Sequence, residues 1–309
     1  MAGTRDARRY IAPLNALRSD SSARGPWTAA FAAAAFACAA LLATAASAAE
    51  LKLSTWNLEW LTSRERDLPP DVRPKRPEDI DLLQRYAVDL NADVIAIQEV
   101  DGAAIAARVF PPDRYSIHMS HDRVVQRVGI VVRRGIHYDV NPDLTGLDVD
   151  PARDLRSGVD ITLRLQPPLR VLAVHLKTGC FDDRLSGRTN RSCTELREQM
   201  PPLLDWIGAR QAEGIAFAIL GDFNRHMDGR DQFWDALSRA APLTRATEGR
   251  ASPCWGSEPF IDHIILGGAA RDWLEPNTLR VMTYRETGDE WKQRLSDHCP
   301  VSVRLHLPE

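Results

Sequence analysis

The sequence predicts one α+β domain in which stacked β-sheets are covered by helices. Three observations lead to this prediction. Short runs typical of strands recur along the chain, few segments have the spacing of an amphipathic helix, and no linker interrupts the series after residue 48. The chain has 309 residues, 44% hydrophobic and 26% charged, which is enough for one large globular domain.

Residues 1–48 have the features of an export signal. Five arginines and two aspartates are followed by an uncharged, Ala-rich run over residues 27–49, and Ala46-Ser47-Ala48 forms a small-x-small cleavage pattern. We therefore expect a mature chain that begins near Ala49 and is secreted or periplasmic. An uncleaved membrane anchor is the alternative, because the run is long enough to span a bilayer.

The first part of the expected domain, residues 49–309, combines strands and helices. Alternating apolar and polar residues predict a strand over 51–59. Residues 62–77 are rich in proline and charge, which predicts an exposed loop. Apolar residues at helical spacing predict an amphipathic helix over 78–90. A strand over 93–100 and a short helix over 103–110 follow.

Strands dominate the remainder of the chain. Helices are expected over 196–210 and 232–239, and Pro201-Pro202 should break or restart the first of them. Alternating or continuous apolar runs predict strands over 115–120, 128–133, 157–165, 169–175, 215–220, 260–266, 278–284 and 301–307.

Four cysteines follow the export segment, and an even number in an exported chain indicates disulfides. Cys180 and Cys193 bracket a short polar loop, so we expect them to pair, with a stabilisation of about 3 kcal/mol in the chain-entropy model. Cys254 would then pair with Cys299. Two free buried thiols are a nearly equal alternative for this second pair.

The charge balance limits the partners. The formal net charge is −3, and because residues 1–48 contribute +3, the rest of the chain carries −6. Such a chain is not a general polyanion-binding protein, and contacts with nucleic acid would need bound cations or local basic clusters. Solvated loop charge explains the basic loop residues almost as well as phosphate contact does: Arg64, Arg66, Arg73, Lys75, Arg76, Arg123, Arg127, Arg184, Arg188 and Arg191.

Polar side chains able to do chemistry recur where the strands end. Residues two apart in an extended chain share a side, so Asp222 and Asn224 should project together beyond the run that stops at Gly221. Asp262 interrupts an apolar strand, and burying a carboxylate is costly unless it is paired or binds a metal. Each residue alone is explained by a turn or a satisfied core position, but together they predict a site: Asn57, Glu59, Glu99, His175, Asp222, Asn224, Asp262, Asp297 and His298.

These residues stand in six motifs that make the chain resemble the endonuclease/exonuclease/phosphatase superfamily. This superfamily of metal-dependent phosphodiesterases includes the deoxyribonuclease I-like nucleases, and we expect a secreted, bacterial-type member. The resemblance covers about residues 50–307 and implies a two-sheet β-sandwich flanked by helices on both outer faces, with the site at one edge. The motifs occur in the family's order: Trp56-Asn57-Leu58-Glu59, Ile97-Gln98-Glu99, Val174-His175-Leu176-Lys177, Gly221-Asp222-Phe223-Asn224, Ile261-Asp262-His263 and Ser296-Asp297-His298.

The resemblance implies a metal site built around Glu99. Asn57 is expected beside it, Glu59 matches a second acidic or amide residue near the metal, and Asp297 matches a further ligand. Hard oxygen ligands suit Mg²⁺, or Mn²⁺ and Ca²⁺. The cysteines lack the spacing of a zinc site.

The resemblance also implies the catalytic roles. Asp222 matches the residue that orients or deprotonates the attacking water, and Asn224 its amide partner. His298 matches the histidine at the scissile phosphate, Asp262 the carboxylate that orients it, and His175 the other phosphate-side histidine.

Two arginines are candidates for phosphate binding. The family often has a tyrosine two residues before the Gly129-Ile130 strand, and this chain has Arg127 there. A cation would thus replace a hydroxyl group. Arg156 is a second candidate, for which a solvated arginine at a strand end is an equal explanation.

The expected reaction is hydrolysis of a phosphoester by in-line attack of water, without a covalent intermediate. We expect a secreted nuclease acting on DNA or RNA, monomeric and without stable membrane association after the signal is removed. A phosphatase or a sphingomyelinase-like phospholipid phosphodiesterase of the same superfamily is the first alternative. A non-catalytic binding protein that retains the fold is the second, and the presence of every matched polar residue argues against it.

Overall fold

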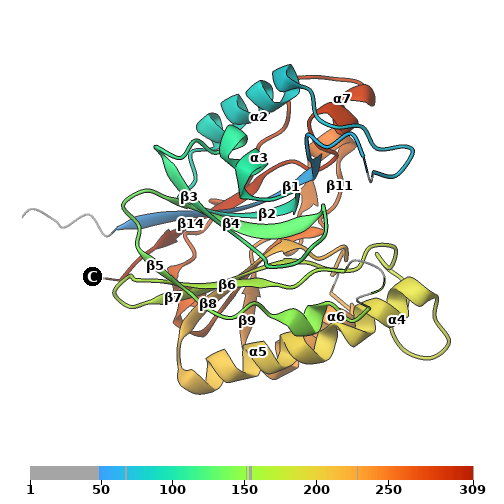
Figure 1. Ribbon diagram of the computed structural model, residues 1–309. Coiled ribbons are helices and arrows are strands. Elements are labelled where there is room, and N and C mark those ends of the chain that lie inside the picture. Colours follow the sequence, from blue (N-terminus) through green and yellow to red (C-terminus); the bar gives the residue numbers. More distant parts are fainter. Residues whose placement is uncertain (1–48, 67, 151, 153–154, 228, 309) are drawn as a thin grey trace, which may run out of the picture. The chain divides into compact units, whose positions relative to one another are not determined.

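The computed structural model describes residues 49–66, 68–150, 152, 155–227 and 229–308 (Figure 1). The predicted export signal, residues 1–48, lies outside the described residues. Among the helices within these ranges, none is both long enough and apolar enough to cross a membrane.

The described chain builds two six-stranded sheets. In the first, only the neighbours β1 and β2 run parallel, and its order is β13 (Arg280–Val281), β14 (Val301–His306), β1 (Glu50–Leu61), β2 (Val94–Val100), β4 (Arg127–Arg133), β3 (Tyr115–Met119). In the second, only β7 and β8 run parallel, and its order is β5 (Tyr138–Val140), β6 (Val159–Leu163), β7 (Leu169–His175), β8 (Ala216–Asp222), β12 (Asp262–Gly267), β9 (Leu243–Arg245).

Helices cover the outer faces, so the predicted four-layer α/β/β/α sandwich is confirmed (Figure 1). Helices α2 (Pro77–Leu90) and α3 (Ala103–Val109) lie against the first sheet. Helices α4 (Arg191–Glu198), α5 (Met200–Glu213) and α6 (Gln232–Ala240) lie against the second. Among the described residues, the short elements include the β10–β11 hairpin (Ala251–Ser252 and Glu258–Pro259), α7 (Glu290–Arg294) and the 3-10 segments Thr145–Leu147, Cys254–Gly256 and Gly268–Trp273.

The central core lies between the sheets and follows the two-residue period of the strands. In β1, Leu51 and Leu53 face this core, whereas Trp56 and Leu58 face the helical layer. In β8, Ala216, Ala218 and Leu220 likewise face the core. A polar residue that continues this inward series beyond the core is therefore directed to the edge between the sheets.

The helix predicted over 196–210 is two helices, α4 and α5, as the two prolines suggested. They divide at Gln199, and Pro201 and Pro202 occupy the first turn of α5, where a missing N–H costs little.

Three expectations about strands were incomplete or wrong. Asp262 is the first residue of β12 rather than its middle, because the chain before it forms the β10–β11 hairpin. Only Arg280–Val281 of the strand predicted over 278–284 is paired. The short strands β5, β9, β10 and β11 were not predicted, since two or three residues carry no readable period.

Candidate active site

The predicted site residues meet at the edge between the two sheets. Asn57, His175 and Asp222 continue the inward series of β1, β7 and β8, and Asp262 stands opposite Asp222 in the β8–β12 register. Gly221 permits the close approach of β7, because a Cβ there would lie 2.0 Å from the Val174 carbonyl oxygen.

Asp222 is the centre of the group. Its Oδ1 accepts a hydrogen bond from the Asn224 backbone N–H at 2.8 Å, and its Oδ2 accepts one from Asn57 Nδ2 at 3.1 Å. The side chain is buried, and this burial raises its pKa to about 7, an effect that the His298 imidazolium opposes. Asp222 is thus a carboxylate able to take up a proton near neutral pH.

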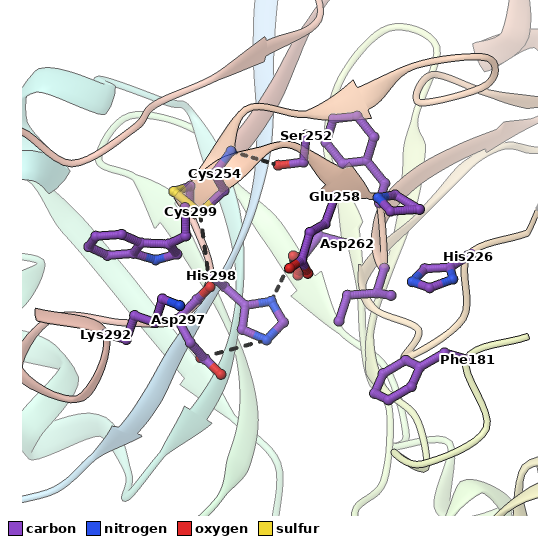
Figure 2. Close-up of a pocket in the computed structure, with 14 residues that line it drawn as sticks. Phe181, His226, Ser252, Cys254, Glu258, Asp262, Lys292, Asp297, His298 and Cys299 are labelled. Atoms are coloured by element: carbon purple, nitrogen blue, oxygen red, sulfur yellow. Dashed lines mark hydrogen bonds and ion pairs between the residues drawn. A yellow bond between two sulfur atoms is a disulfide. The ribbon is translucent and has the colours of Figure 1, made fainter. Parts of the chain in front are cut away.

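His298 is held as a cation among three carboxylates. Its Nδ1–H donates to Asp262 Oδ2 at 2.7 Å, and its Nε2 lies 3.8 Å from Asp297 Oδ1 (Figure 2). The same Nε2 lies 3.7 Å from Asp222 Oδ2. Burial alone would lower the pKa of His298, but Asp262, Asp222 and Asp297 outweigh it and raise that pKa well above its usual value. Nε2 is therefore a positioned proton donor.

The backbone around His298 is fixed by two motif residues, Ser296 and Trp56, and by Tyr284, which the sequence did not single out. The His298 N–H donates to Ser296 Oγ at 3.0 Å, and that hydroxyl donates to the Asn57 carbonyl at 2.7 Å. The Tyr284 hydroxyl donates to the His298 carbonyl and accepts from Trp56 Nε1, both at 2.9 Å. These bonds join the segment before β14 to the end of β1.

Glu99 shares a donor with Asp222. Asn57 Nδ2 lies 3.2 Å from Glu99 Oε1 and 3.1 Å from Asp222 Oδ2, so the two carboxylates converge on one amide. The Asn57 oxygen accepts from the Glu59 N–H at 2.9 Å, which fixes this orientation of the amide. In this arrangement Asn57 orients carboxylates and turns its own oxygen away from them.

Backbone strain concentrates at these residues. Glu59, Trp60, Glu99 and Asn224 have φ values of 38°, 50°, 60° and 50°, in the left-handed region that side chains other than glycine rarely adopt. Such conformations cost about 1–3 kcal/mol each and persist where the surroundings impose them, typically at functional sites. The strain at Glu99 turns its carboxylate out of the regular alternation of β2.

Lys75 corrects one expectation about the loops. The sequence predicts Lys75 to be an exposed loop cation, solvated or in contact with phosphate, but its side chain is buried. Its Nζ donates to Glu59 Oε2 at 2.9 Å and to the Gln293 carbonyl at 2.5 Å. Burial raises the pKa of Glu59 to about 7, although Lys75 opposes this shift. Glu59 already accepts a hydrogen bond from the Lys75 ammonium group.

His175 lies beside the two central carboxylates, and Arg156 lies within their electrostatic reach. His175 Nε2 lies 3.7 Å from Glu99 Oε1 and 3.6 Å from Asp222 Oδ2. Burial, and then the Arg156 cation, lower the pKa of His175 well below its usual value, so its ring is neutral. Burial also lowers the pKa of Arg156, while the charges of Glu99 and Asp222 oppose that shift.

The two arginines differ in their surroundings. Arg127 Nη2 donates to the Asp101 carbonyl at 3.2 Å and lies 4.0 Å from the Asp101 carboxylate. Arg156 is buried, donates to Gln126 Oε1 at 3.0 Å, and lies within the electrostatic reach of Glu99 and Asp222. Arg156 is therefore the better placed phosphate-binding candidate.

Asn224 has a different contact from the one expected. Its side-chain Nδ2 donates to the Leu176 carbonyl at 3.0 Å, and its backbone N–H, rather than its amide, contacts Asp222. Asn224 thus ties the end of β8 to the end of β7 and orients Asp222 through the main chain.

The donor set fits a divalent cation. Oxygen atoms of Glu99 and Asp222 converge, and the ligand atoms of Asp222, Asp262 and His298 lie within 4.8 Å of one another. Asp262 Oδ1 is buried, with no hydrogen-bond partner among the described residues. A protonated His298 does not ligate a metal. Glu99 is therefore the better ligand, with Glu59 and Asp297 as the carboxylates near it.

Two disulfides lie beside the site, one from the loop after β7 and one from the β10–β11 hairpin. Cys180 is bonded to Cys193, and Cys254 to Cys299. The second bond joins the β10–β11 hairpin to the residue after His298, and it forms one wall of the pocket in Figure 2.

One protein-family model matches most of the chain. Residues 54–298 match the model of the Endonuclease/Exonuclease/phosphatase family. No curated protein matches the chain.

Solved structures share the fold at low sequence identity. TDP2 from Caenorhabditis elegans is 15% identical, with a TM-score of 0.59, over 90% of this chain and 82% of that one. TDP2 from D. rerio, complexed with single strand DNA product, is 13% identical, with a TM-score of 0.57, over 83% and 98%. The 3′ phosphatase NExo from Neisseria, bound to a product DNA hairpin, is 17% identical, with a TM-score of 0.55, over 82% and 99%.

Proposed function

We propose, from the premise that this chain belongs to the endonuclease/exonuclease/phosphatase family, that it is a divalent-metal-dependent phosphodiesterase acting on nucleic acid. Members of this family are typically phosphoester hydrolases. The observation that carries the proposal is the pairing of Asp222, a buried carboxylate, with His298, a cation held by Asp262. A proton acceptor and a proton donor thus lie 3.7 Å apart at one edge of the sandwich.

In the proposed reaction Asp222 takes a proton from the attacking water. A pKa of about 7 makes this carboxylate a base matched to neutral pH. The Asn224 N–H and Asn57 Nδ2 hold its two oxygens, so the base is oriented before substrate binds. The water then attacks phosphorus in line with the leaving oxygen.

His298 and Arg156 bind the phosphate oxygens, where negative charge increases in the transition state. Asp262 keeps the His298 proton on Nδ1 and supports the imidazolium form, which leaves Nε2–H to donate to the phosphate. Glu99 and Asp297 are the proposed metal ligands, with Asn57 and Glu59 beside them. A bound Mg²⁺ would neutralise phosphate charge and stabilise the leaving oxygen.

Nucleic acid is the substrate class with the best support. Two structural neighbours were solved with DNA products, one single-stranded and one a hairpin. The phosphatase and phospholipid activities are the second candidate, and the 3′ phosphatase among the neighbours favours the former. We also propose that the chain is exported through residues 1–48 and that it acts as a monomer without stable membrane association.

The test compares wild type with Asp222→Ala and His298→Ala. We expect wild type to hydrolyse plasmid DNA, single-stranded DNA or RNA with Mg²⁺ and to lose this activity in EDTA, with Mn²⁺ and Ca²⁺ compared as replacements. Each variant should lose at least roughly 10²-fold in kcat/KM while keeping its circular dichroism spectrum. Full activity in either folded variant would refute the assignment.

The same assays separate the alternatives. Sphingomyelin, inositol phosphates and a 3′-phosphorylated oligonucleotide are offered beside the nucleic acids. Cleavage of a lipid or a monoester alone would replace the nuclease proposal. Binding of oligonucleotide without hydrolysis under all metal conditions would favour a non-catalytic binding protein.

A further inference from the structure

A pocket of about 430 Å³ extends from the Asp262–His298 pair toward an aromatic side chain on the surface. Asp262, Asp297 and His298 line its inner end, and Phe181 and His226 line its other side (Figure 2). Its volume is in the range of about 300–1,000 Å³ that is typical of small-molecule sites. The mechanism above uses only the inner end.

Phe181 is unusual among the described residues. It is one of three large hydrophobic side chains that are exposed, at 39%. Its ring stacks on the His226 imidazole with centroids 5.8 Å apart and planes at 24°. One face of the phenyl ring is thus backed by a second flat ring, which leaves apolar surface open to solvent beside a polar site.

The loop that presents Phe181 is tied to the rest of the molecule by a disulfide and by hydrogen bonds to its backbone. Cys180 is bonded to Cys193, and the buried Arg225 donates through Nη1 to the carbonyls of Cys180 at 2.7 Å and Asp183 at 2.8 Å. The His226 N–H donates to the Phe181 carbonyl at 3.2 Å. The backbone on both sides of Phe181 is therefore fixed, and the His226 ring contacts its side chain.

The acidic groups on this side of the pocket disfavour a phosphate at Phe181, and Lys292, which also lines the pocket, lies on the Asp297 side (Figure 2). Asp182 holds His226 Nδ1 at 2.7 Å, and Glu258 lines the same pocket. A flat, uncharged ring fits these surroundings better than an anion does. A nucleobase has a π-face whatever its identity, and base–aromatic stacking is a common way to bind unpaired strands.

We propose that Phe181, backed by His226, is a stacking subsite for one unpaired nucleobase of the substrate. The inference rests on the proposed function and narrows it to nucleic acid that is single-stranded or locally unpaired at the cleavage site. Bases inside a duplex stack on one another, so their faces are not available to Phe181 until they leave the stack.

The test uses single-stranded oligonucleotides with one abasic residue, placed in turn on either side of the cleaved bond. For wild type, we expect a base at the subsite position to raise kcat/KM about tenfold over the abasic residue, chiefly through KM. Phe181→Ala should abolish this difference and leave the abasic rate unchanged, and Phe181→Trp should retain it. Val88→Ala, at a position 41% exposed on α2, is the control that should change neither rate.

A binding measurement separates this inference from the proposed function. In EDTA, an oligonucleotide carrying 2-aminopurine should lose fluorescence on binding wild type and Phe181→Trp, and much less on binding Phe181→Ala. Equal quenching by all three proteins, or no base preference in wild-type cleavage, would overturn the subsite. Quenching that depends on Phe181 without cleavage under any metal condition would support the subsite and refute the hydrolase.

Discussion

At the residue scale, the Asp262–His298 hydrogen bond decides whether the histidine acts as a donor. The 2.7 Å bond fixes the proton on Nδ1, and Asp262 is the largest of the influences that raise the pKa of His298 against its burial. A carboxylate–imidazole pair of this kind orients the ring and stabilises its cation.

Asp262→Asn should therefore lower the pKa of His298 and reduce kcat/KM by about 10²–10⁴-fold on whichever phosphodiester wild type prefers. The change keeps the side-chain volume, so the protein should remain folded. Titration of the His298 ring by NMR and steady-state kinetics measure the two effects. Asp139→Asn, on an exposed strand, is the control. An unchanged pKa with reduced activity would contradict this account.

His263 predicts how acid affects stability. It is buried, its Nε2–H donates to the Arg225 carbonyl at 2.8 Å, and Nδ1 accepts from the Thr247 hydroxyl at 2.6 Å, so both nitrogens are satisfied in the neutral ring. Burial lowers the pKa of His263 to about 3. The unfolded chain thus binds a proton that the folded chain does not, and stability present above pH 6.5 is lost as the pH falls from about 6.5 toward 3.

Because of His263, the free energy of unfolding should be about 2 kcal/mol lower at pH 5 than at pH 7. His263→Gln keeps a donor and an acceptor but cannot be protonated. The decrease in its unfolding free energy between pH 7 and pH 5 should therefore be about 2 kcal/mol smaller than that of wild type. Urea unfolding at both pH values gives the comparison, with the exposed His306→Gln as control. The same pH dependence in His263→Gln and wild type would show that this ring is not the cause.

At the element scale, periodicity predicted the long elements and failed for the short ones. Strands such as β7 (Leu169–His175) and helix α2 have enough residues for their period to be read. The hairpin β10–β11 has two residues in each strand and depends on its surroundings. That hairpin is why Asp262 begins β12 and faces His298, a placement that an apolar run alone could not predict.

Helix α6 shows how one residue can hold an element and a loop together. Asp231 caps this helix, because its Oδ1 accepts from the N–H groups of Phe233 at 3.1 Å and Trp234 at 3.0 Å. Its Oδ2 accepts from the buried Arg225 Nε at 2.7 Å. Arg225 in turn fixes the loop that carries Phe181.

Asp231→Ala should lower the unfolding free energy by about 3–5 kcal/mol, since it removes a cap and leaves Arg225 buried without its partner. Asp231→Asn keeps the cap and should cost less. Denaturant unfolding measures both, and the exposed Asp205→Ala on α5 should stay within about 0.5 kcal/mol of wild type. Equal losses for Ala and Asn would assign the cost to charge rather than capping, and no loss in either would reject the account.

At the scale of the whole molecule, much of the site followed from the sequence because the fold obeys alternation. Asn57, His175 and Asp222 each continue the inward series of a strand, so their convergence was predictable once the strands were known. The family resemblance supplied the sandwich that brings their ends together. Local pattern and resemblance were sufficient for this part.

The rest depends on contacts between distant segments. Lys75 lies in a Pro- and charge-rich run, yet it reaches the Gln293 carbonyl and is buried. Arg156 is buried within electrostatic reach of Glu99 and Asp222, whereas Arg127 donates to the Asp101 carbonyl. No spacing in the sequence reports such pairings, because they are set by how loops pack over the edge of the sandwich.

The two disulfides act at different scales, which gives a final prediction. Cys254–Cys299 spans 45 residues and ties the β10–β11 hairpin to the segment just before β14 of the first sheet, beside His298. Cys180–Cys193 spans 13 residues and holds only the loop of Phe181. In the chain-entropy model these loops stabilise by about 4 and about 3 kcal/mol respectively.

Replacing Cys254 and Cys299 together by Ala should thus cost about 4 kcal/mol of unfolding free energy and lower kcat, because His298 loses its anchor. Replacing Cys180 and Cys193 should cost about 3 kcal/mol and raise KM for base-containing oligonucleotides, because Phe181 loses its rigid support. Each double variant is the control for the other in urea unfolding and in cleavage kinetics. If both changed kcat and KM in the same way, the separation between a catalytic end and a base-binding end of the pocket would be wrong.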